Sequence, residues 1–285
     1  MNVTLRRATP ADAEKCGAIC HDAFKAIAER HQFPPDFSSP EIAITLLSWL
    51  LEDPGFYGVV AEKDGRIVGS AFMDERSSIA GIGPVTVDAA MQNHGVGRAL
   101  MRHVLQRVAE QKFAGARLVQ AAYHNRSLSL YASLGFVVRE PLVVLQGAPP
   151  RVQISGCEVR SAREDDLENG HELCRKIHGH DRGGELADAV NQGTASVVVR
   201  DGRIAGYATM VAFFGHAVGE TNEELKALIA AAPGFAAPGF LLPARNGELL
   251  RWCLENGLKV VQPMTLMSLG FYQEPAGAFL PSILY

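Results

Sequence analysis

The stretch Val85-Thr-Val-Asp-Ala-Ala-Met-Gln-Asn-His-Gly-Val-Gly97 decides how the rest of the chain is interpreted. It begins with a β-branched run typical of a buried strand, and it ends in two glycines. The apolar residues that follow recur at helical spacing, at Val96, Leu100, Met101, Val104, Leu105 and Val108. The stretch therefore predicts a strand, a tight loop and the N-terminus of a helix.

This loop predicts a site for an anion. The first N–H groups of a helix have no partners within it and lie at the positive end of its dipole. Gly95 and Gly97 carry no Cβ atom, so a phosphate can approach the main chain closely, although two glycines also serve ordinary strand-to-helix turns. A dinucleotide fingerprint is excluded because Leu100 stands where it requires a third Gly or Ala. A Walker loop is excluded because no Gly-Lys-Ser/Thr follows.

Two motifs in order resemble the GNAT superfamily of N-acyltransferases. The segment Gln92-Asn-His-Gly-Val-Gly97 is similar to its acyl-CoA loop, Gln/Arg-x-x-Gly-x-Gly/Ala. After a predicted strand at 118–122, Asn125-Arg-Ser-Leu-Ser-Leu-Tyr-Ala-Ser-Leu-Gly-Phe136 resembles its Asn-containing helix that ends in Tyr-x-x-Leu-Gly-Phe. The resemblance implies acetyl-CoA, or another acyl-CoA, as co-substrate and no metal. It implies that the cofactor is bound by Val85, Thr86, Val87, Gln92, Asn93, His94, Gly95, Val96, Gly97, Arg98, Ala99, Asn125 and Tyr131.

The resemblance also implies a mechanism. In such enzymes the thioester lies between two splayed strands, here 85–87 and 118–122, and a neutral amine attacks it directly. A main-chain N–H near Val87 would stabilise the oxyanion. Tyr131 would donate a proton to the leaving thiolate, although a tyrosine at such a helical position is also a common core residue. For the base that receives the proton of the amine, Glu75 is our first candidate, with Asp74 and Asp88 as alternatives.

Composition excludes several other classes of protein. The chain has 285 residues, 47% of them hydrophobic, and a net charge of −4 without basic clusters, which argues against a nucleic-acid partner. No apolar run reaches membrane-spanning length, so we expect a cytoplasmic protein without a membrane partner. Five scattered cysteines without a Cys-x-x-Cys predict buried thiols, and His178 with His180 lacks a third ligand for a metal site. Whether the chain is a monomer or a homodimer stays open.

The pattern of elements predicts two tandem domains of mixed α/β (α+β) class, each a twisted mixed sheet flanked by helices on both faces. The expected boundaries are residues 1–146 for an acyl-CoA-binding catalytic domain, 147–156 for a linker and 157–285 for a degenerate second GNAT-like domain. Three segments of the first half recur in order in the second: 4–13 at 158–167, 64–69 at 201–206 and 133–136 at 268–271.

The second copy departs from the motifs. The segment 243–252 takes the place of the Gly-x-Gly loop in this interpretation, and its Glu248 would repel a pyrophosphate. Leu266 or Met267 would stand where the first copy has Tyr131. The second domain is therefore expected to fold without binding acyl-CoA, to pack on the first and to contribute to its acceptor cleft.

The resulting hypothesis is an acetyl-CoA-dependent N-acetyltransferase that acts on a primary amine of a small molecule or peptide. The loop at 31–37 and the helix at 39–51 would form one wall of the acceptor site, where Phe33, Phe37 and Trp49 either shape a pocket or pack beneath the loop. The alternatives are a non-catalytic acyl-CoA-binding sensor, which would not need Tyr131, and a structural protein with two relic domains.

Overall fold

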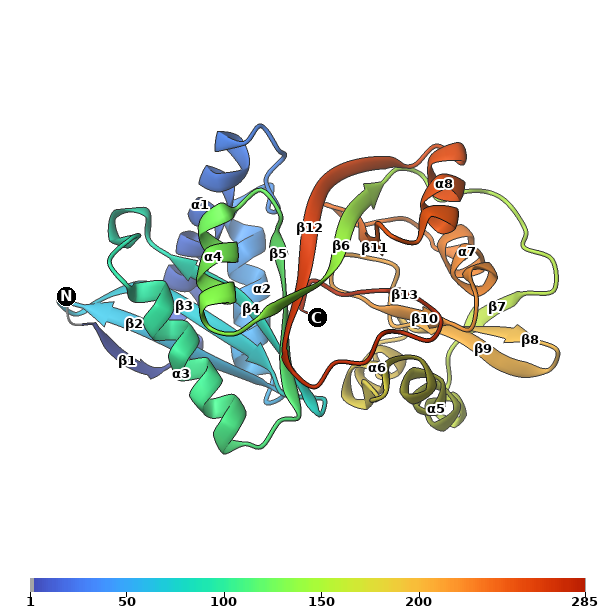
Figure 1. Ribbon diagram of the computed structural model, residues 1–285, viewed down its shortest axis with the longest axis horizontal. Coiled ribbons are helices and arrows are strands. Elements are labelled where there is room, and N and C mark those ends of the chain that lie inside the picture. The colour runs from blue at the N-terminus through green and yellow to red at the C-terminus, as the bar shows by residue number, and fades with distance from the viewer. Residues whose placement is uncertain (1–2, 285) are drawn as a thin grey trace.

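The computed structural model describes residues 3–284, and its strands form two sheets (Figure 1). The larger sheet contains, in spatial order, β1 (Thr4–Arg7), β2 (Phe56–Lys63), β3 (Arg66–Asp74), β4 (Ile79–Val87), β5 (Gly115–Ala121), β12 (Lys259–Gly270), β6 (Val137–Gln146) and β11 (Phe240–Pro243). The smaller sheet contains β13 (Ala278–Leu280), β10 (Ala217–Gly219), β9 (Arg203–Ala208), β8 (Ser196–Arg200) and β7 (Glu158–Ser161). Among the described strands, β4 and β5 alone pair in parallel, so the predicted mixed sheet is confirmed for the larger of the two.

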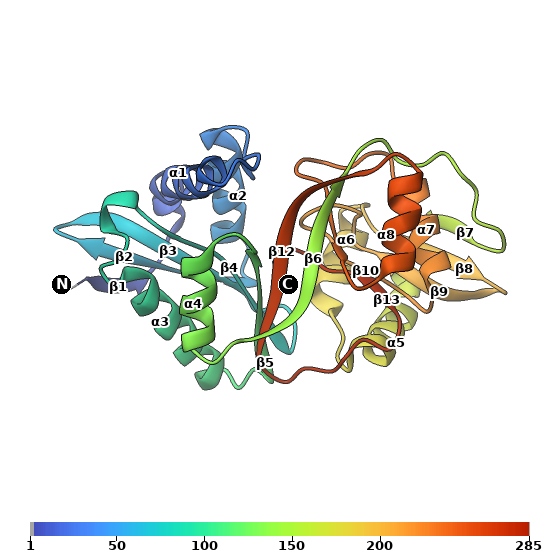
Figure 2. The same cartoon turned by 45° about the horizontal axis from the view of Figure 1, so that its top comes forward.

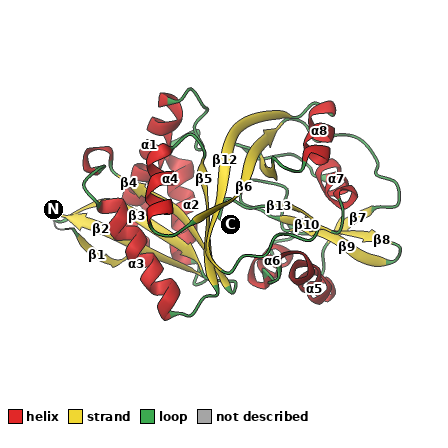
Figure 3. Ribbon diagram, viewed as in Figure 1, coloured by secondary structure: helices red, strands yellow, loops and turns green. Residues whose placement is uncertain are grey.

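The helices are distributed over both halves of the chain (Figure 3). They are α1 (Ala13–Arg30), α2 (Pro40–Glu52), α3 (Val96–Glu110), α4 (Asn125–Ser133), α5 (Leu167–His178), α6 (Gly183–Asn191), α7 (Asn222–Ala231) and α8 (Gly247–Glu255), with 3-10 turns at Pro10–Asp12, Ala89–Met91 and Glu164–Asp166. Within residues 3–284, no helix is long and apolar enough to cross a bilayer.

The two faces of the larger sheet carry different helices, as Figure 2 shows, with α1 and α2 on one face and α3 and α4 on the other. Alternate residues of β2 pack against the helices on the two faces, because successive residues of a strand point to opposite faces of the sheet. Val59 and Ala61 are buried against the α3 and α4 side, whereas Val60 between them is buried against α1 and α2. A further buried cluster, which includes Ile79, Leu142, Phe213, Leu241 and Met264, joins strands and loops from both halves.

Two of the three predicted repeats are confirmed. The turns of the β2–β3 and β8–β9 hairpins have positive φ at both central residues, +52° and +73° at Asp64-Gly65 and +51° and +74° at Asp201-Gly202. The equivalence extends to β1 and β7. Arg6 binds Asp12 bidentately, with 2.8 Å for both hydrogen bonds, and the matching Arg160–Asp166 pair has distances of 2.6 and 2.7 Å.

The third repeat is wrong, because 133–136 ends a helix whereas 268–271 ends the long strand β12. The true counterpart of α4 is α8, which also has nine residues and is followed by a glycine in the left-handed region, as at Gly135 and Gly257. The strands that follow these helices, β6 and β12, exchange places. β12 lies between β5 and β6, while β6 lies between β12 and β11, so each half completes the sheet of the other (Figure 1). The division of the chain at residues 147–156 stays a prediction.

The parallel strands β4 and β5 separate along their length. They are paired only at Ile79–Gly81 and Gly115–Arg117, and beyond this point β5 is bonded to β12 alone. A register shift between β3 and β4 lies at the same level. The split predicted between residues 85–87 and 118–122 is therefore present, and it leaves main-chain groups of both strands without strand partners.

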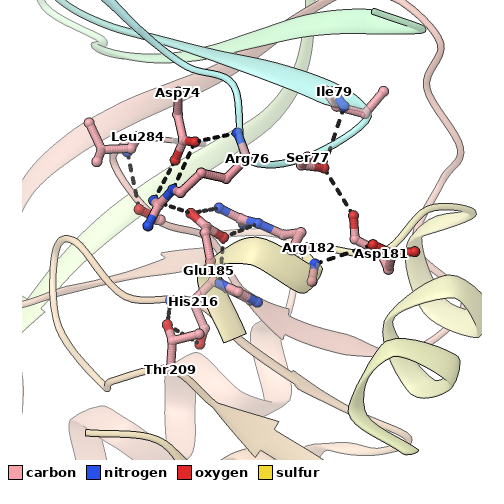
Figure 4. A network of polar contacts seen from close by, with 12 residues as sticks. Asp74, Arg76, Ser77, Ile79, Asp181, Arg182, Glu185, Thr209, His216 and Leu284 are labelled. Carbon is pink, nitrogen blue, oxygen red and sulfur yellow. Dashed lines mark hydrogen bonds and ion pairs between the residues drawn. The ribbon is translucent and has the colours of Figure 1, made fainter. Parts of the chain in front are cut away.

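Buried charges join the two halves of the chain (Figure 4). Arg76, in the turn between β3 and β4, donates to Asp74 Oδ2 at 2.6 Å and to Asp188 Oδ2 on α6 at 2.7 Å. The Arg76 side chain is 12% exposed and its guanidinium also covers the ring of Phe56 at 4.6 Å. Glu185 on α6 lies 3.7 Å from the same guanidinium. The network therefore fixes the β3–β4 turn against the second half.

We expect the folded protein to lose stability as the pH falls below neutral. Burial lowers the pKa of His216 to about 4 and that of His180 to about 4, so both rings are neutral in the folded protein at pH 6. The unfolded chain binds those protons near pH 6.5, so the free energy of unfolding falls as the pH drops from about 6.5 towards 4. Urea titrations at pH 7 and pH 5 will show a lower midpoint at pH 5. Equal midpoints would contradict the prediction.

Candidate functional site

The loop between β4 and α3 has the geometry of an anion-binding nest. Asn93 and Gly95 both have positive φ, +65° and +84°, and Gly95 is the N-cap residue of α3. Positive φ at alternate residues of a loop turns backbone N–H groups towards a common side, and a helix N-terminus adds its dipole. Gln92 closes the loop by donating from Nε2 to the carbonyl of Val87 at 3.2 Å.

The two glycines of the loop serve different purposes. Gly95 is needed for its backbone conformation, since its φ is +84°. Gly97 has helical dihedrals, and a Cβ there would make ordinary contacts, 3.6 Å from Leu130 and 3.7 Å from Val87. Packing within the protein therefore does not require Gly97. Its missing side chain leaves the first turn of α3 open towards the cavity described next.

A cavity of about 910 Å³ runs through the larger sheet where β4 and β5 separate. On one face it is lined by the nest and by α4, and on the other by α1 and the α1–α2 loop. The second half of the chain contributes Phe213, Phe214, Met264, Ile283 and Leu284 to its walls. The predicted contribution of the second half to the cleft of the first is therefore present.

Most of the predicted cofactor-binding residues line this one cavity. They are Val85, Thr86, Val87, Gln92, Asn93, Gly95, Val96, Gly97, Arg98, Asn125 and Tyr131. His94 is exposed in the loop outside the cavity, and Ala99 is engaged in α3, where its N–H donates to Gly95 O at 3.0 Å. The N–H of Val87 faces the split, because that of Asp88 donates to Val68 O at 2.9 Å and successive N–H groups along a strand alternate in direction.

Two arginines surround the nest. Arg126, at the start of α4, donates to Gln92 Oε1 at 2.8 Å and to Asn93 Oδ1 at 3.4 Å. Arg98 on α3 donates to Ser133 Oγ at 3.0 Å. Both line the cavity, so positive charge adds to the backbone donors. We had not predicted Arg126, although it directly follows the Asn125 of the second motif.

Tyr131 is a buried residue on the inner side of α4, and it lines the cavity. Its ring packs edge-on against Phe136, with 6.2 Å between centroids. Burial raises the pKa of Tyr131 to about 12, so the hydroxyl is protonated at neutral pH. Within residues 3–284 this hydroxyl has no hydrogen-bond partner in the protein, and it is available to a ligand.

Two side chains that line the cavity contain buried nitrogen atoms without a hydrogen-bond partner among the described residues. Gln120 on β5 accepts from Ser127 Oγ at 2.7 Å through Oε1, and its Nε2 has no partner among the described residues. His124 Nε2 is likewise unpaired within the described chain, and burial lowers the pKa of His124 to about 4, with Arg126 acting in the same direction. Unpaired buried polar atoms are costly, so these two nitrogen atoms are places where the protein alone leaves a hydrogen bond unmade.

The carboxylates proposed from the sequence lie elsewhere. Glu75 accepts from Arg107 Nη2 at 2.7 Å and does not line the cavity. Asp74 belongs to the Arg76 network, and Asp88 accepts from the N–H of Ala90 at 2.9 Å in the turn after β4. None of the three is placed to receive a proton from a substrate in the cavity. The base role predicted for Glu75 is therefore not supported by its position.

Asp36 is the acidic residue that sequence reasoning missed. Of the described residues that line the cavity, Asp36 alone has a carboxylate. The segment 31–37 contains no motif, so only its aromatics were considered. Of these, Phe37 lines the cavity, Phe33 stacks on Tyr123 with centroids 4.4 Å apart, and Trp49 packs against Phe56 away from the cavity.

The second half has no equivalent of the nest. Between β10 and α7, Thr221 caps the helix, and Glu224 accepts from both the N–H and the Oγ1 of Thr221 at 2.7 Å. A buried carboxylate thus occupies the helix N-terminus that would otherwise receive an anion. Glu248 lies in α8, the counterpart of α4, and pairs with Lys226 at 2.8 Å, so its predicted place beside a phosphate loop is wrong.

Known proteins share both the sequence pattern and the fold. Residues 23–136 match the model of the acetyltransferase (GNAT) family, and no curated protein sequence matches the chain. A putative acetyltransferase from Pyrococcus horikoshii is similar over 97% of this chain and 94% of its own, with 20% identity and a TM-score of 0.74. A GCN5-related N-acetyltransferase from Sphaerobacter thermophilus covers 95% and 96%, with 16% identity and a TM-score of 0.60.

The tandem arrangement is also found in a solved structure. A tandem GNAT protein from the clavulanic acid biosynthesis pathway is similar over 94% of this chain and 98% of its own, with 12% identity and a TM-score of 0.56. At these identities the likeness concerns the fold. Together with the nest and the split sheet, these matches identify residues 23–136 as a domain of the acetyltransferase (GNAT) family, within a chain that has the tandem GNAT fold.

Proposed function

We propose that this protein is an N-acetyltransferase that transfers the acetyl group of acetyl-CoA to a primary amine by direct attack. The observation that carries the proposal is the cavity through the split sheet. It has a bare helix N-terminus with two arginines on one face of the sheet, and Tyr131 lines it. The diphosphate of coenzyme A fits the nest, and the pantetheine pairs with the strand edges that β4 and β5 leave free.

The reaction needs little from the protein beyond position and charge. The amine nitrogen forms a bond to the thioester carbon, the oxyanion accepts the N–H of Val87, and the carbon–sulfur bond breaks. Tyr131 gives its proton to the departing thiolate of coenzyme A and is reprotonated from solvent, while the nitrogen of the product amide loses its extra proton to solvent. Holding both substrates in the cavity replaces a bimolecular encounter by a reaction within one complex. This lowers the activation free energy by an amount on the order of several kcal/mol.

The glycine at position 97 offers a test of cofactor binding. Gly97→Ala is expected to weaken acetyl-CoA binding roughly tenfold, because the new methyl group enters the space for the phosphate. A tenfold loss of affinity corresponds to about one hydrogen bond to a charged group. The free energy of unfolding will stay equal or rise by up to ~1 kcal/mol, since alanine is the better helix residue. Calorimetry measures the affinity, and release of free thiol with amine acceptors measures turnover.

Gly247→Ala is the matched control. Gly247 opens α8, where a Cβ has nothing within 4 Å, and it lies outside the cavity. This variant will bind acetyl-CoA as the unmodified protein does. Absence of any heat with acetyl-CoA in the unmodified protein would refute the proposed function.

A further inference from the structure

Asp36 lines the cavity from the loop between α1 and α2, and thus from the face of the sheet opposite the nest. Its carboxylate accepts from Gln262 Nε2 at 2.8 Å, and Gln262 Oε1 accepts from the Tyr123 hydroxyl at 3.2 Å. Because the amide must donate to Asp36 and accept from Tyr123, its orientation is fixed. Gln262 is 1% exposed and comes from β12, so the second half holds the carboxylate in place.

Burial raises the pKa of Asp36, and the hydrogen bond from Gln262 offsets only part of this effect. Within residues 3–284, no lysine, arginine or histidine forms an ion pair with Asp36. Of the arginines that line the cavity, Arg98 and Arg126 belong to the nest, and Arg30 is exposed at the end of α1. A carboxylate in a cavity is stabilised by a cation that enters with a ligand, and an amine enters as an ammonium ion.

The walls around Asp36 are apolar and aromatic. In the same cavity, Phe24 meets Phe37 edge-on at 6.1 Å between ring centroids, and Phe213 meets Phe214 at 5.8 Å. Leu284 is buried in the same cluster as Phe37. A polyamine or a sugar amine would leave its polar groups unpaired against these walls, whereas an apolar group would be removed from water.

We propose that the acceptor is a primary amine on an apolar, preferably aromatic, body, and that Asp36 is the residue that binds its ammonium group. Asp36 also receives the proton that the nitrogen loses before attack, and it passes this proton to solvent. Phe213 and Phe214, from the loop between β9 and β10, make the second half of the chain a wall of the acceptor pocket. The inference rests on the proposed acetyl transfer.

The test compares four probes in the thiol-release assay with acetyl-CoA: 2-phenylethylamine, ethylamine, spermidine and 2-phenylethanol. We expect kcat/KM for 2-phenylethylamine to exceed that for ethylamine at least tenfold, in the range that pocket contacts provide. Spermidine will be a poorer acceptor than 2-phenylethylamine. The alcohol, which has no ammonium group, will not react. Binding of 2-phenylethylamine in the presence of coenzyme A, followed by calorimetry, gives a second readout that does not depend on turnover.

Two variants separate the role of Asp36 from a structural one. Asp36→Asn retains the shape of the side chain and is expected to raise KM for 2-phenylethylamine at least tenfold, because a charged partner is lost, while acetyl-CoA affinity stays the same. Asp22→Asn is the matched control, since Asp22 is a 78% exposed carboxylate on α1 outside the cavity. Phe214→Ala will reduce the preference for 2-phenylethylamine over ethylamine.

The experiments distinguish failure of this inference about the acceptor from failure of the proposed acetyl transfer. If acetyl-CoA does not bind, the acetyl transfer itself is wrong. If acetyl-CoA binds but spermidine is preferred, or no apolar amine reacts or binds, the acceptor class is overturned. Preference for octanoyl-CoA over acetyl-CoA without any selection among amines would assign the apolar walls to an acyl chain, and it too would overturn the inference. An unchanged KM in Asp36→Asn would remove Asp36 from the ammonium site.

Discussion

Replacement of Tyr131 by phenylalanine is expected to lower kcat about 100-fold while the affinity for acetyl-CoA remains unchanged. The variant removes one oxygen atom, which has no partner among residues 3–284, so the packing against Phe136 persists. Without the hydroxyl the thiolate must leave unprotonated, and the barrier of the chemical step rises. Steady-state kinetics with 2-phenylethylamine, alongside calorimetry with acetyl-CoA, measure the two quantities separately.

Tyr57→Phe serves as the control for this variant. The Tyr57 hydroxyl contacts His103 Nε2 at 2.8 Å and lies outside the cavity, so its loss will leave kcat unchanged. A fall of less than about threefold in Tyr131→Phe would show that the hydroxyl is not the proton donor. Binding of acetyl-CoA without turnover on any amine in the unmodified protein would instead favour a sensor of acyl-CoA.

Arg76→Ala is expected to give the largest loss of stability, about 3–5 kcal/mol, because it leaves a buried carboxylate without its partner. Asp74 is 7% exposed, and two of its contacts with the Arg76 guanidinium, at 2.6 and 3.0 Å, disappear. Asp188 on α6 loses its partner in the same change. Urea unfolding at pH 7 measures the effect, and the β3–β4 turn will become more accessible to proteases.

The control is an exposed pair of the same kind. Arg203 binds Glu220 at 2.6 Å with a 57% exposed side chain, and Arg203→Ala will change the urea midpoint little. The double variant Asp74→Ala with Arg76→Ala will lose less than the sum of the two single variants, since neither charge is then left alone. Additive losses would show that the two side chains act independently.

The loop between β4 and α3 was predictable from sequence because its information is local. The β-branched run before Asp88, the positive-φ glycine at 95 and the apolar periodicity of α3 each act within a few residues. The same holds for the hairpin turns at 64–65 and 201–202, whose dihedrals are set by the turn residues themselves. The repeat of these local signals was sufficient to predict two similar halves.

The partners of buried polar groups were not predictable in this way. Asp36 meets Gln262 across 226 positions, and Arg76 meets Asp188 across 112, so no window of sequence contains either pair. The predicted base Glu75 is plausible by its position along the chain, yet Arg107 on α3, 32 positions away, binds it. The role of a buried side chain depends on which polar groups lie beside it in the low-dielectric interior. Tertiary packing decides which groups those are.

The sequence by itself determined the strand, loop and helix of the nest, the position of Tyr131 and the duplication, because backbone propensity and periodicity act locally. Only the tertiary structure decided that β6 and β12 exchange places between the halves. The physical reason is that strands of similar pattern can pair with several edges, and the choice depends on the fit of whole layers. That exchange brings Gln262 of β12 to Asp36 and makes the second half a wall of the pocket.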